Sequence, residues 1–238
     1  MADKIINLDG VKVTFFKSSK AKNINISIKP NRGVRVSVPR FVSFKNAERF
    51  AHQKIGWMKK HLSKMQTLEN KATVFNMDTE FYTKQHSLLI EKKAVNDYKT
   101  TIQSGVIKVT IPNEFHISSI ESQNFIKQAI EKTWRKEAKE LLTKRTAELA
   151  QIHGFKFNKV SIRNSKTRWG SCSYNNNINL SLHLMMLPDH LIDYVILHEL
   201  AHTKEKNHGI HFWKLLDNLT GNAKGLDKEV KQYRIGVY

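Results

Sequence analysis

The feature that most constrains the fold of this chain is the segment HELAH at residues 198–202, in which two histidines flank a glutamate. Four residues of an α-helix turn through about 400°, so His198 and His202 are expected one turn apart on the same helical face. Both imidazoles can then reach one metal ion, and Glu199 stands beside them as an acceptor for a proton from water. This combination is typical of zinc hydrolases.

The HELAH segment is unlikely to arise by chance, and its surroundings favour a helix. Random placement of the His and Glu residues of this chain predicts about 0.03 copies of the pattern. Pro188 suits a first helical turn, and apolar residues follow it at helical spacing. Two surface histidines on an ordinary helix are the alternative. The stretch 194–201 is largely apolar, however, and a charge buried there needs a partner such as a metal ion.

A catalytic zinc ion usually has three protein ligands and a fourth position for water. The candidates for the third ligand are His208, His211, Glu205 and Glu229. We expect His208, because Asn207 is a good N-cap that would place it at the start of a second helix, facing the first. The positive end of that helix would favour the neutral, metal-binding imidazole. His211 is better suited to stabilising an oxyanion, and Glu229 remains the thermolysin-like alternative.

Two sequence blocks can be compared with a known family. They are RWGSCS at 168–173 with INL at 178–180 and Pro188, and YVILHELAH at 194–202 with NHG at 207–209 and FW at 212–213. Together they resemble the YgjP-like metallopeptidases, which are relatives of the SprT-like zinc proteases. The resemblance implies that His198, His202 and His208 bind the metal and that Glu199 is the base. The family pattern often has serine where this chain has Gly209, which leaves these assignments unchanged.

Composition and cysteine content predict the setting of the protein. The chain has 238 residues, 40% of them hydrophobic and 26% charged, as in a soluble globular protein of one large or two small domains. No apolar run approaches the ~20 residues of a membrane span, and no signal-peptide core begins the chain. We therefore expect a cytoplasmic protein without a membrane partner. Cys172, the single cysteine, fits a reducing compartment and a structural role.

Positive charge is concentrated in the first part of the chain. Residues 17–64 contain 13 Lys and Arg against one acid, whereas residues 186–238 contain seven of each sign. The net charge of +19 thus lies mostly away from the HELAH segment. Such a field attracts polyanions, so non-specific nucleic acid or a phosphorylated ligand is a possible partner, with a solvated basic surface as the alternative. The expected contacts are Lys17, Lys20, Lys22, Arg32, Arg35 and Arg40.

The first half of the chain contains one pattern twice. Alternating strands are expected at 24–28 and 34–38, followed by Pro39 and a helix at about 43–63. The same order returns with strands near 88–111, then Pro112 and a helix at about 118–152. Either a duplication or the common occurrence of the strand-strand-helix arrangement in proteins explains the similarity.

These elements predict an α+β fold. A β-hairpin-rich N-terminal region with helices is expected over residues 1–115. It is followed by a zincin-like helical metallopeptidase domain over residues 116–238, with a small antiparallel sheet of strands at 159–163 and 177–181. In zinc peptidases an edge strand can pair with an extended substrate, and Asn177–Ser181 is the candidate here. Arg168 and Trp169 precede it, and Arg168 is a second candidate for the oxyanion donor.

The sequence therefore predicts a zinc-dependent metallopeptidase that hydrolyses peptide bonds in a peptide or protein substrate, with Glu199 as general base. Two alternatives stay open. One is a metal-dependent nucleotide or phosphoanhydride hydrolase, because an activated water attacks acyl and phosphoryl groups alike. The other is a nucleic-acid-associated protein with a structural metal, although such a site has no need of a base.

Overall fold

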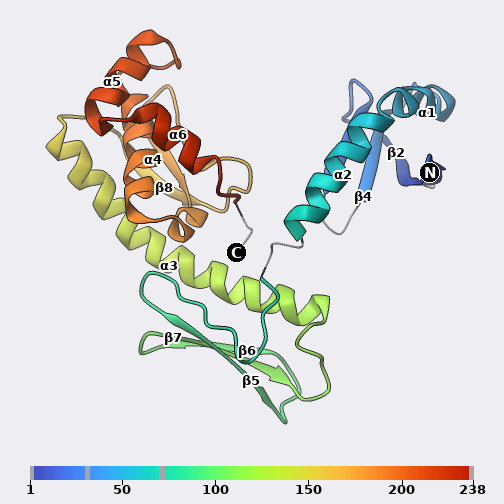
Figure 1. Ribbon diagram of the computed structural model, residues 1–238, viewed down its shortest axis with the longest axis horizontal. Coiled ribbons are helices and arrows are strands. Elements are labelled where there is room, and N and C mark those ends of the chain that lie inside the picture. The colour runs from blue at the N-terminus through green and yellow to red at the C-terminus, as the bar shows by residue number, and fades with distance from the viewer. Residues whose placement is uncertain (1–2, 30–32, 70–72, 236–238) are drawn as a thin grey trace. The chain divides into compact units, whose positions relative to one another are not determined.

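The computed structural model describes residues 3–29, 33–69 and 73–235, and the chain divides along its sequence into two compact units, with the boundary after residue 72 (Figure 1). Each unit has its own hydrophobic core. The boundary expected between residues 115 and 116 falls inside the second unit, because the strands at 87–112 pack against the helix that follows them. In the described part of the chain, no helix is long and apolar enough to cross a membrane.

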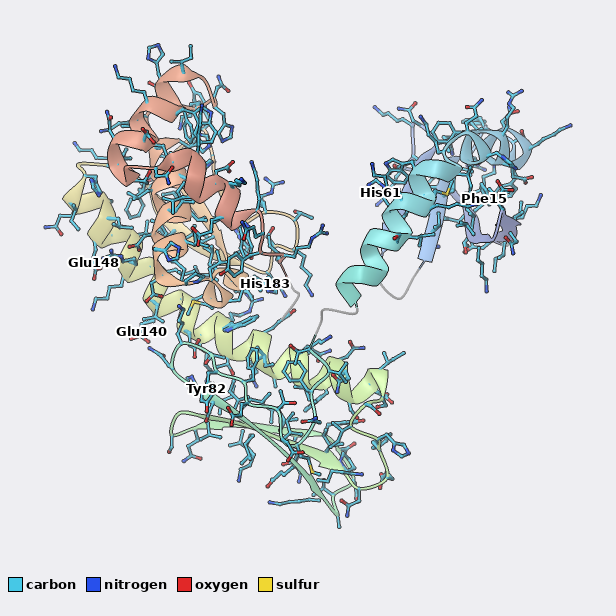
Figure 2. All side chains as sticks on the ribbon, viewed as in Figure 1. Phe15, His61, Tyr82, Glu140, Glu148 and His183 are labelled. Carbon is cyan, nitrogen blue, oxygen red and sulfur yellow. The ribbon has the colours of Figure 1, made fainter. Side chains whose placement is uncertain are left out.

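The first unit is a four-stranded sheet with two helices. Its elements are β1 (Lys4–Leu8), β2 (Val11–Ser18), β3 (Asn25–Lys29), β4 (Gly33–Pro39), α1 (Phe44–Gln53) and α2 (Ile55–Glu69). The strand order is β1-β2-β4-β3, with β2 and β4 parallel and the other pairs antiparallel. Alternate residues of β2 and β4 are buried, among them Phe15, which is labelled in Figure 2. The single helix expected at 43–63 is two helices, with Lys54 as the C-cap of the first.

The residues expected to contact a polyanion differ in their surroundings. Lys17 takes part in the fold, because its Nζ donates to backbone carbonyls at the end of β4 and just after it, and lies 5.0 Å from the centre of the Phe44 ring. The Arg35 guanidinium lies over the Phe16 ring, 4.4 Å from its centre. Arg32 lies outside the described residues. Three of the residues are exposed side chains: Lys20, Lys22 and Arg40.

The second unit begins with a three-stranded sheet and a long helix. These elements are β5 (Ser87–Lys93), β6 (Lys99–Gln103), β7 (Val106–Pro112) and α3 (Ile120–Ile152). The strand order is β5-β7-β6. Ser119 caps α3, because its Oγ accepts the backbone N–H of Ser122 at 3.1 Å. One part of α3 packs on β7, and other parts contact the elements that follow (Figure 1).

The HELAH segment lies in the last part of this unit. The elements are β8 (Lys159–Arg163), β9 (Gly170–Cys172), β10 (Asn177–Ser181), the 3-10 helix η1 (Leu182–Met186), α4 (Asp189–Ala201), α5 (Ile210–Thr220) and α6 (Ala223–Val230). α4 contains the HELAH segment up to Ala201 and contacts α3, β9, α5 and α6. The structure is thus a mixed α+β fold with several small sheets and six α-helices in its described part.

Two expectations for the third sheet are wrong. The sheet is mixed and not antiparallel, because β10 pairs parallel with β8 and antiparallel with β9. Asn177–Ser181 is the central strand and not an edge, since the order is β8-β10-β9. Both errors have one cause: Gly170–Cys172 was not recognised as a strand. This short strand pairs antiparallel with β10 and forms one edge of the sheet, so that β10 becomes the central strand.

A hydrogen-bond network joins α3 to the loop before β9. His183 of η1, labelled in Figure 2, is fully buried, and its Nε2 lies 2.9 Å from Oδ1 of Asn164. The amide of Asn164 donates to Glu131 of α3 at 2.8 Å. Burial lowers the pKa of His183, so the neutral ring is the favoured form, with Nε2–H as donor. The network fixes one end of the loop that leads into β9.

Candidate metal centre

The helix predicted for the HELAH segment is present as α4. Pro188 is its N-cap residue, and most of the side chains from Leu191 to Ala201 are buried. His198 lies in the last turn, and His202 is the C-cap residue with helical backbone angles. Both rings are therefore on the same face, and their centres are 5.0 Å apart.

The structure brings three imidazoles to one point. Nε2 of His208 lies 3.0 Å from Nε2 of His198 and 3.1 Å from Nε2 of His202. One nitrogen from each ring lies within 4.8 Å of the other two. Two nitrogens bound to a tetrahedral zinc ion at ~2.0–2.1 Å are about 3.3 Å apart. The spacing of the three rings therefore fits a single ion.

The protonation of the rings also fits a metal. Nδ1 of His202 lies 2.9 Å from the backbone carbonyl oxygen of Glu205, a contact in which Nδ1–H donates and leaves Nε2 as the unprotonated nitrogen. Burial, reinforced by the neighbouring histidines, lowers the pKa of His198 to about 4, although Asp227 acts in the opposite direction. Burial likewise lowers the pKa of His202. Neutral imidazoles with an inward nitrogen are what a cation requires.

His208 lies in the turn before α5 and not in its first turn. The expected N-cap, Asn207, is not the cap residue, which is Gly209. The reason is a tight turn in which the carbonyl of Asn207 accepts the N–H of Gly209 at 2.8 Å, so the helix starts two residues later than expected. This turn directs the ring of His208 toward α4.

The other candidates for the third ligand lie elsewhere. Oε1 of Glu229 on α6 lies 2.8 Å from Nε2 of His190, two turns of α4 before His198. Glu205 contributes its backbone carbonyl to the ring of His202. His211 is exposed on α5, and among the described residues the group of three contains His208 instead.

Phe212 is the residue beneath the three rings, a role that the sequence analysis missed. Its ring centre lies 4.9, 4.5 and 4.7 Å from those of His198, His202 and His208, and its side chain is fully buried. The available signal was its spacing of four residues from His208. Phe212 holds all three imidazoles in place by packing.

Glu199 lies beside the histidines with its carboxylate buried. Its side chain is only 5% exposed, and burial raises its pKa to about 8, although Arg168 acts to lower it. In the described part of the chain, Oε2 has no hydrogen-bond partner. A carboxylate placed in this way is available to accept a proton.

Gly170 of β9 makes room for this carboxylate. A Cβ atom at residue 170 would lie 2.6 Å from Oε1, 2.7 Å from Cγ and 2.9 Å from Cδ of Glu199. These distances are shorter than ordinary van der Waals contacts. In the sequence, Gly170 stands out only as part of the RWGSCS block, and nothing there indicates that its lack of a side chain makes room for Glu199.

β9 also presents backbone groups at its open edge. The N–H of Ser181 donates to the carbonyl of Trp169, and the N–H of Ser173 donates to the carbonyl of Asn177. Hydrogen-bonded residues alternate along an antiparallel pair, so the N–H and C=O groups of Gly170 and Cys172 point away from β10. β9 is the last strand in the order of the sheet, and a further strand can pair with these groups.

Cys172 is not one of the three clustered side chains. It is half-buried on β9, and burial raises the pKa of its thiol. Among the described residues the clustered group contains only histidines. A neutral thiol in this position is neither a nucleophile nor an anionic ligand.

The comparisons with known proteins add the family. The sequence pattern of the YgjP-like metallopeptidase domain matches residues 22–233, nearly the whole chain. The chain belongs to this family. The resemblance predicted from the two sequence blocks is therefore confirmed, and family membership supports a peptidase that uses a catalytic metal. No curated protein matches the chain.

Two solved structures are similar to part of the chain. They are the metallopeptidase zymogens of jannalysin from Methanocaldococcus jannaschii and of abylysin from Pyrococcus abyssi. Each is 24% identical in sequence, and each match covers 38% of this chain with a TM-score of 0.35. The matches cover 94% of the jannalysin chain and 92% of the abylysin chain.

Proposed function

We propose that this member of the YgjP-like family is a zinc-dependent peptidase of zincin-like arrangement, in which His198, His202 and His208 hold the ion. The observation that carries the proposal is the meeting of three Nε2 atoms beside a buried carboxylate. Histidine nitrogens without carboxylate or thiolate ligands favour zinc over magnesium or calcium. The single cysteine agrees with the cytoplasm as the proposed location.

Glu199 is the proposed general base. When bound, zinc lowers the pKa of a coordinated water toward ~7 and polarises the scissile carbonyl. Oε2 of Glu199 has no partner among the described residues, so it can take a proton from the attacking water. The same atom then delivers this proton to the nitrogen of the leaving amine. The buried surroundings of the carboxylate keep other water molecules away from the proton during the transfer.

The substrate backbone is proposed to pair with the open edge of β9. This strand replaces Asn177–Ser181 in that role, because the backbone groups of Gly170 and Cys172 point away from β10. Gly170 also contacts Glu199, so a peptide on this edge lies next to the proposed base. His211 lies in the first turn of α5, three residues after His208. Of the two oxyanion donors expected from the sequence, it is the one we propose.

The test combines metal content with product analysis. Protein purified without chelators should contain about one zinc per chain, and His208→Ala should lose it while Glu229→Ala retains it. Glu199→Gln should keep the zinc and release new amines from unfolded casein about 10²–10⁴ times more slowly than the wild type. Zinc retention by His208→Ala together with loss in Glu229→Ala would show that the third ligand is wrong.

The same preparation separates the alternative functions. Release of phosphate from a nucleoside triphosphate, without release of amines from casein, would favour a phosphoanhydride hydrolase. Neither product from the zinc-loaded wild type would favour a structural metal. A wild-type rate in Glu199→Gln would overturn the role of the base.

A further inference from the structure

A pocket of about 290 Å³ lies on the polar face of the third sheet, close to the proposed active site. We call it the arginine pocket. Its lining includes Arg163, Ser165, Arg168, Gly170, Ser171 and Asn179. Strand alternation explains the chemistry of this face. Ile178 and Leu180 of β10 are buried in the core, so Asn179 points the other way, together with its cross-strand partner Ser171.

Among the described residues, neither guanidinium group of the pocket forms an ion pair, although Arg168 is near enough to Glu199 to act on the pKa of that carboxyl group. Nε of Arg163 donates to Oδ1 of Asn179 at 3.4 Å, and the amide of Asn179 donates to Oγ of Ser171 at 3.4 Å. These bonds orient Arg163 and leave its two terminal nitrogens available. Among the residues that the structure describes, neither Arg163 nor Arg168 forms an ion pair, and no acid lines the pocket. Two positive charges therefore share one pocket whose lining contains no negative charge.

The arginine pocket adjoins the open edge of β9. Gly170 lines the pocket and also contacts Glu199, so one strand separates the two sites. A peptide paired along β9 directs alternate side chains to the two faces of the sheet. One set then points toward α4, and the other points toward Ser171 and the arginines. β8, which carries Arg163, is two strand spacings from β9 and three from a peptide paired on the open edge of β9, about 14 Å.

We propose that the arginine pocket binds the carboxylate of an acidic side chain of the peptide substrate, an inference that rests on the proposed peptidase function. Arg163 and Arg168 are then specificity-determining residues. A planar guanidinium with two available nitrogens matches a carboxylate in a bidentate geometry. Because the peptide lies three strand spacings from β8, glutamate is favoured over the shorter aspartate. The hydroxyl of Ser171 supplies a further donor to the same anion.

Binding to an inactive variant tests the proposal without requiring cleavage. Zinc-loaded, full-length Glu199→Gln is titrated with fluorescein-labelled decapeptides of alternating Ala-Glu, Ala-Gln, Ala-Asp or Ala-phosphoserine, and anisotropy is measured at 0.15 M salt. Alternation places every charge on one face, whatever the register. The Ala-Glu peptide should bind at least about tenfold more tightly than Ala-Gln, as expected for hydrogen bonds between charged groups. It should also bind more tightly than Ala-Asp.

A matched pair of variants separates the pocket from general charge. R163Q/R168Q, made in the Glu199→Gln background, should remove the preference for Glu over Gln. R40Q/R49Q removes the same charge from exposed positions in the first unit and should leave the preference intact. An unchanged preference in R163Q/R168Q, or an equal loss in R40Q/R49Q, would overturn the proposal. Tight binding of the phosphoserine peptide, without a preference for Glu over Gln, would show that the pocket binds a phosphate and not a carboxylate.

Failure of the arginine pocket as a binding site can be distinguished from failure of the proposed peptidase function. If the wild type releases no amines from casein but the pocket retains its arginine-dependent preference, binding of the acidic side chain is supported and the peptidase activity is refuted. If amines are released and R163Q/R168Q cleaves casein at the same positions as the wild type, with the same share of glutamates near the cut, the pocket is not a specificity site.

Discussion

Substitution of Gly170 by alanine should displace Glu199 without touching a histidine. The new Cβ would lie 2.6 to 2.9 Å from three atoms of the glutamate side chain. The optimum between non-bonded heavy atoms is about 3.5–4.0 Å, so the carboxylate has to move by roughly 1 Å. Gly170 is not among the glycines with positive φ, and alanine is therefore compatible with the backbone. The close approach to Glu199 is therefore the steric conflict that the substitution introduces.

The expected cost to catalysis is large and the cost to stability is moderate. A catalytic group misplaced by 1 Å loses about 10²-fold in rate, so kcat for casein should fall by about this factor. Overpacking of this kind destabilises a protein by about 1–3 kcal/mol, which an unfolding titration can measure. The zinc content should stay at the wild-type value, because Gly170 contacts the base and not a ligand.

The assay measures amine release, bound zinc and the free energy of unfolding on the same preparation. Gly56→Ala is the matched control, because a Cβ there meets no atom within 4 Å and the residue lies in the first unit. This control should keep the wild-type rate. If Gly170→Ala retains both zinc and the wild-type kcat, β9 does not position Glu199. If the zinc is lost, the strand supports the metal centre instead, and our reading of the contact is wrong.

Three further predictions concern other parts of the chain. Phe212→Leu should weaken zinc affinity about 10–100-fold, measured by chelator competition, because the three rings lose their common support; unchanged affinity would contradict this role. Burial lowers the pKa of His183, so the unfolded chain takes up the proton first as the pH falls. The free energy of unfolding should therefore decrease once the pH drops below ~6.5, by at most ~1.4 kcal/mol per pH unit. His183→Gln should show a shallower decrease, and an equal dependence on pH in the two proteins would refute this account. The full chain should bind single-stranded DNA near 50 mM salt and lose it steeply as salt rises, with weaker binding by K20Q/K22Q/R40Q; binding independent of salt would exclude an electrostatic origin.

The helix with the two histidines was predictable because its signal is local. The spacing of His198 and His202, and the apolar residues that precede them, follow from the period of one helix. The position of His208 depended on a turn of only a few residues, and its direction was predicted although the cap residue was not. Roles for these residues remain proposals, but their meeting at one point is a property of the fold.

The parts that were missed depend on contacts between distant residues. β9 has three residues, too few to show an alternating pattern, and its pairing with β10 fixed both the edge and the mixed sheet. The contact of Gly170 with Glu199 joins positions 29 residues apart and leaves no periodic signal. The packing of Phe212 under three imidazoles is likewise tertiary. Sequence patterns predict which residues share one element, and they do not specify which elements meet.

The pairing of the strands connects these observations. The sets β2-β3-β4, β5-β6-β7 and β8-β9-β10 have the same arrangement, in which the first and third strands are parallel neighbours and the second pairs antiparallel with the third. A helix follows each set. The twofold pattern read from the sequence thus has a structural counterpart, and the third sheet shares it.

This arrangement always leaves the second strand at an edge of its sheet, so an open edge exists in every set. What distinguishes the third set is the helix that follows it. α1 contacts β4 and α3 contacts β7, the central strands, and α2 contacts the edge strand β3. α4 contacts both the central strand β10 and the edge strand β9. That contact requires a residue without a side chain, which Gly170 supplies, and it places Glu199 beside exposed backbone groups. A common sheet topology therefore provides an open strand edge next to the histidines only where the HELAH helix reaches that edge.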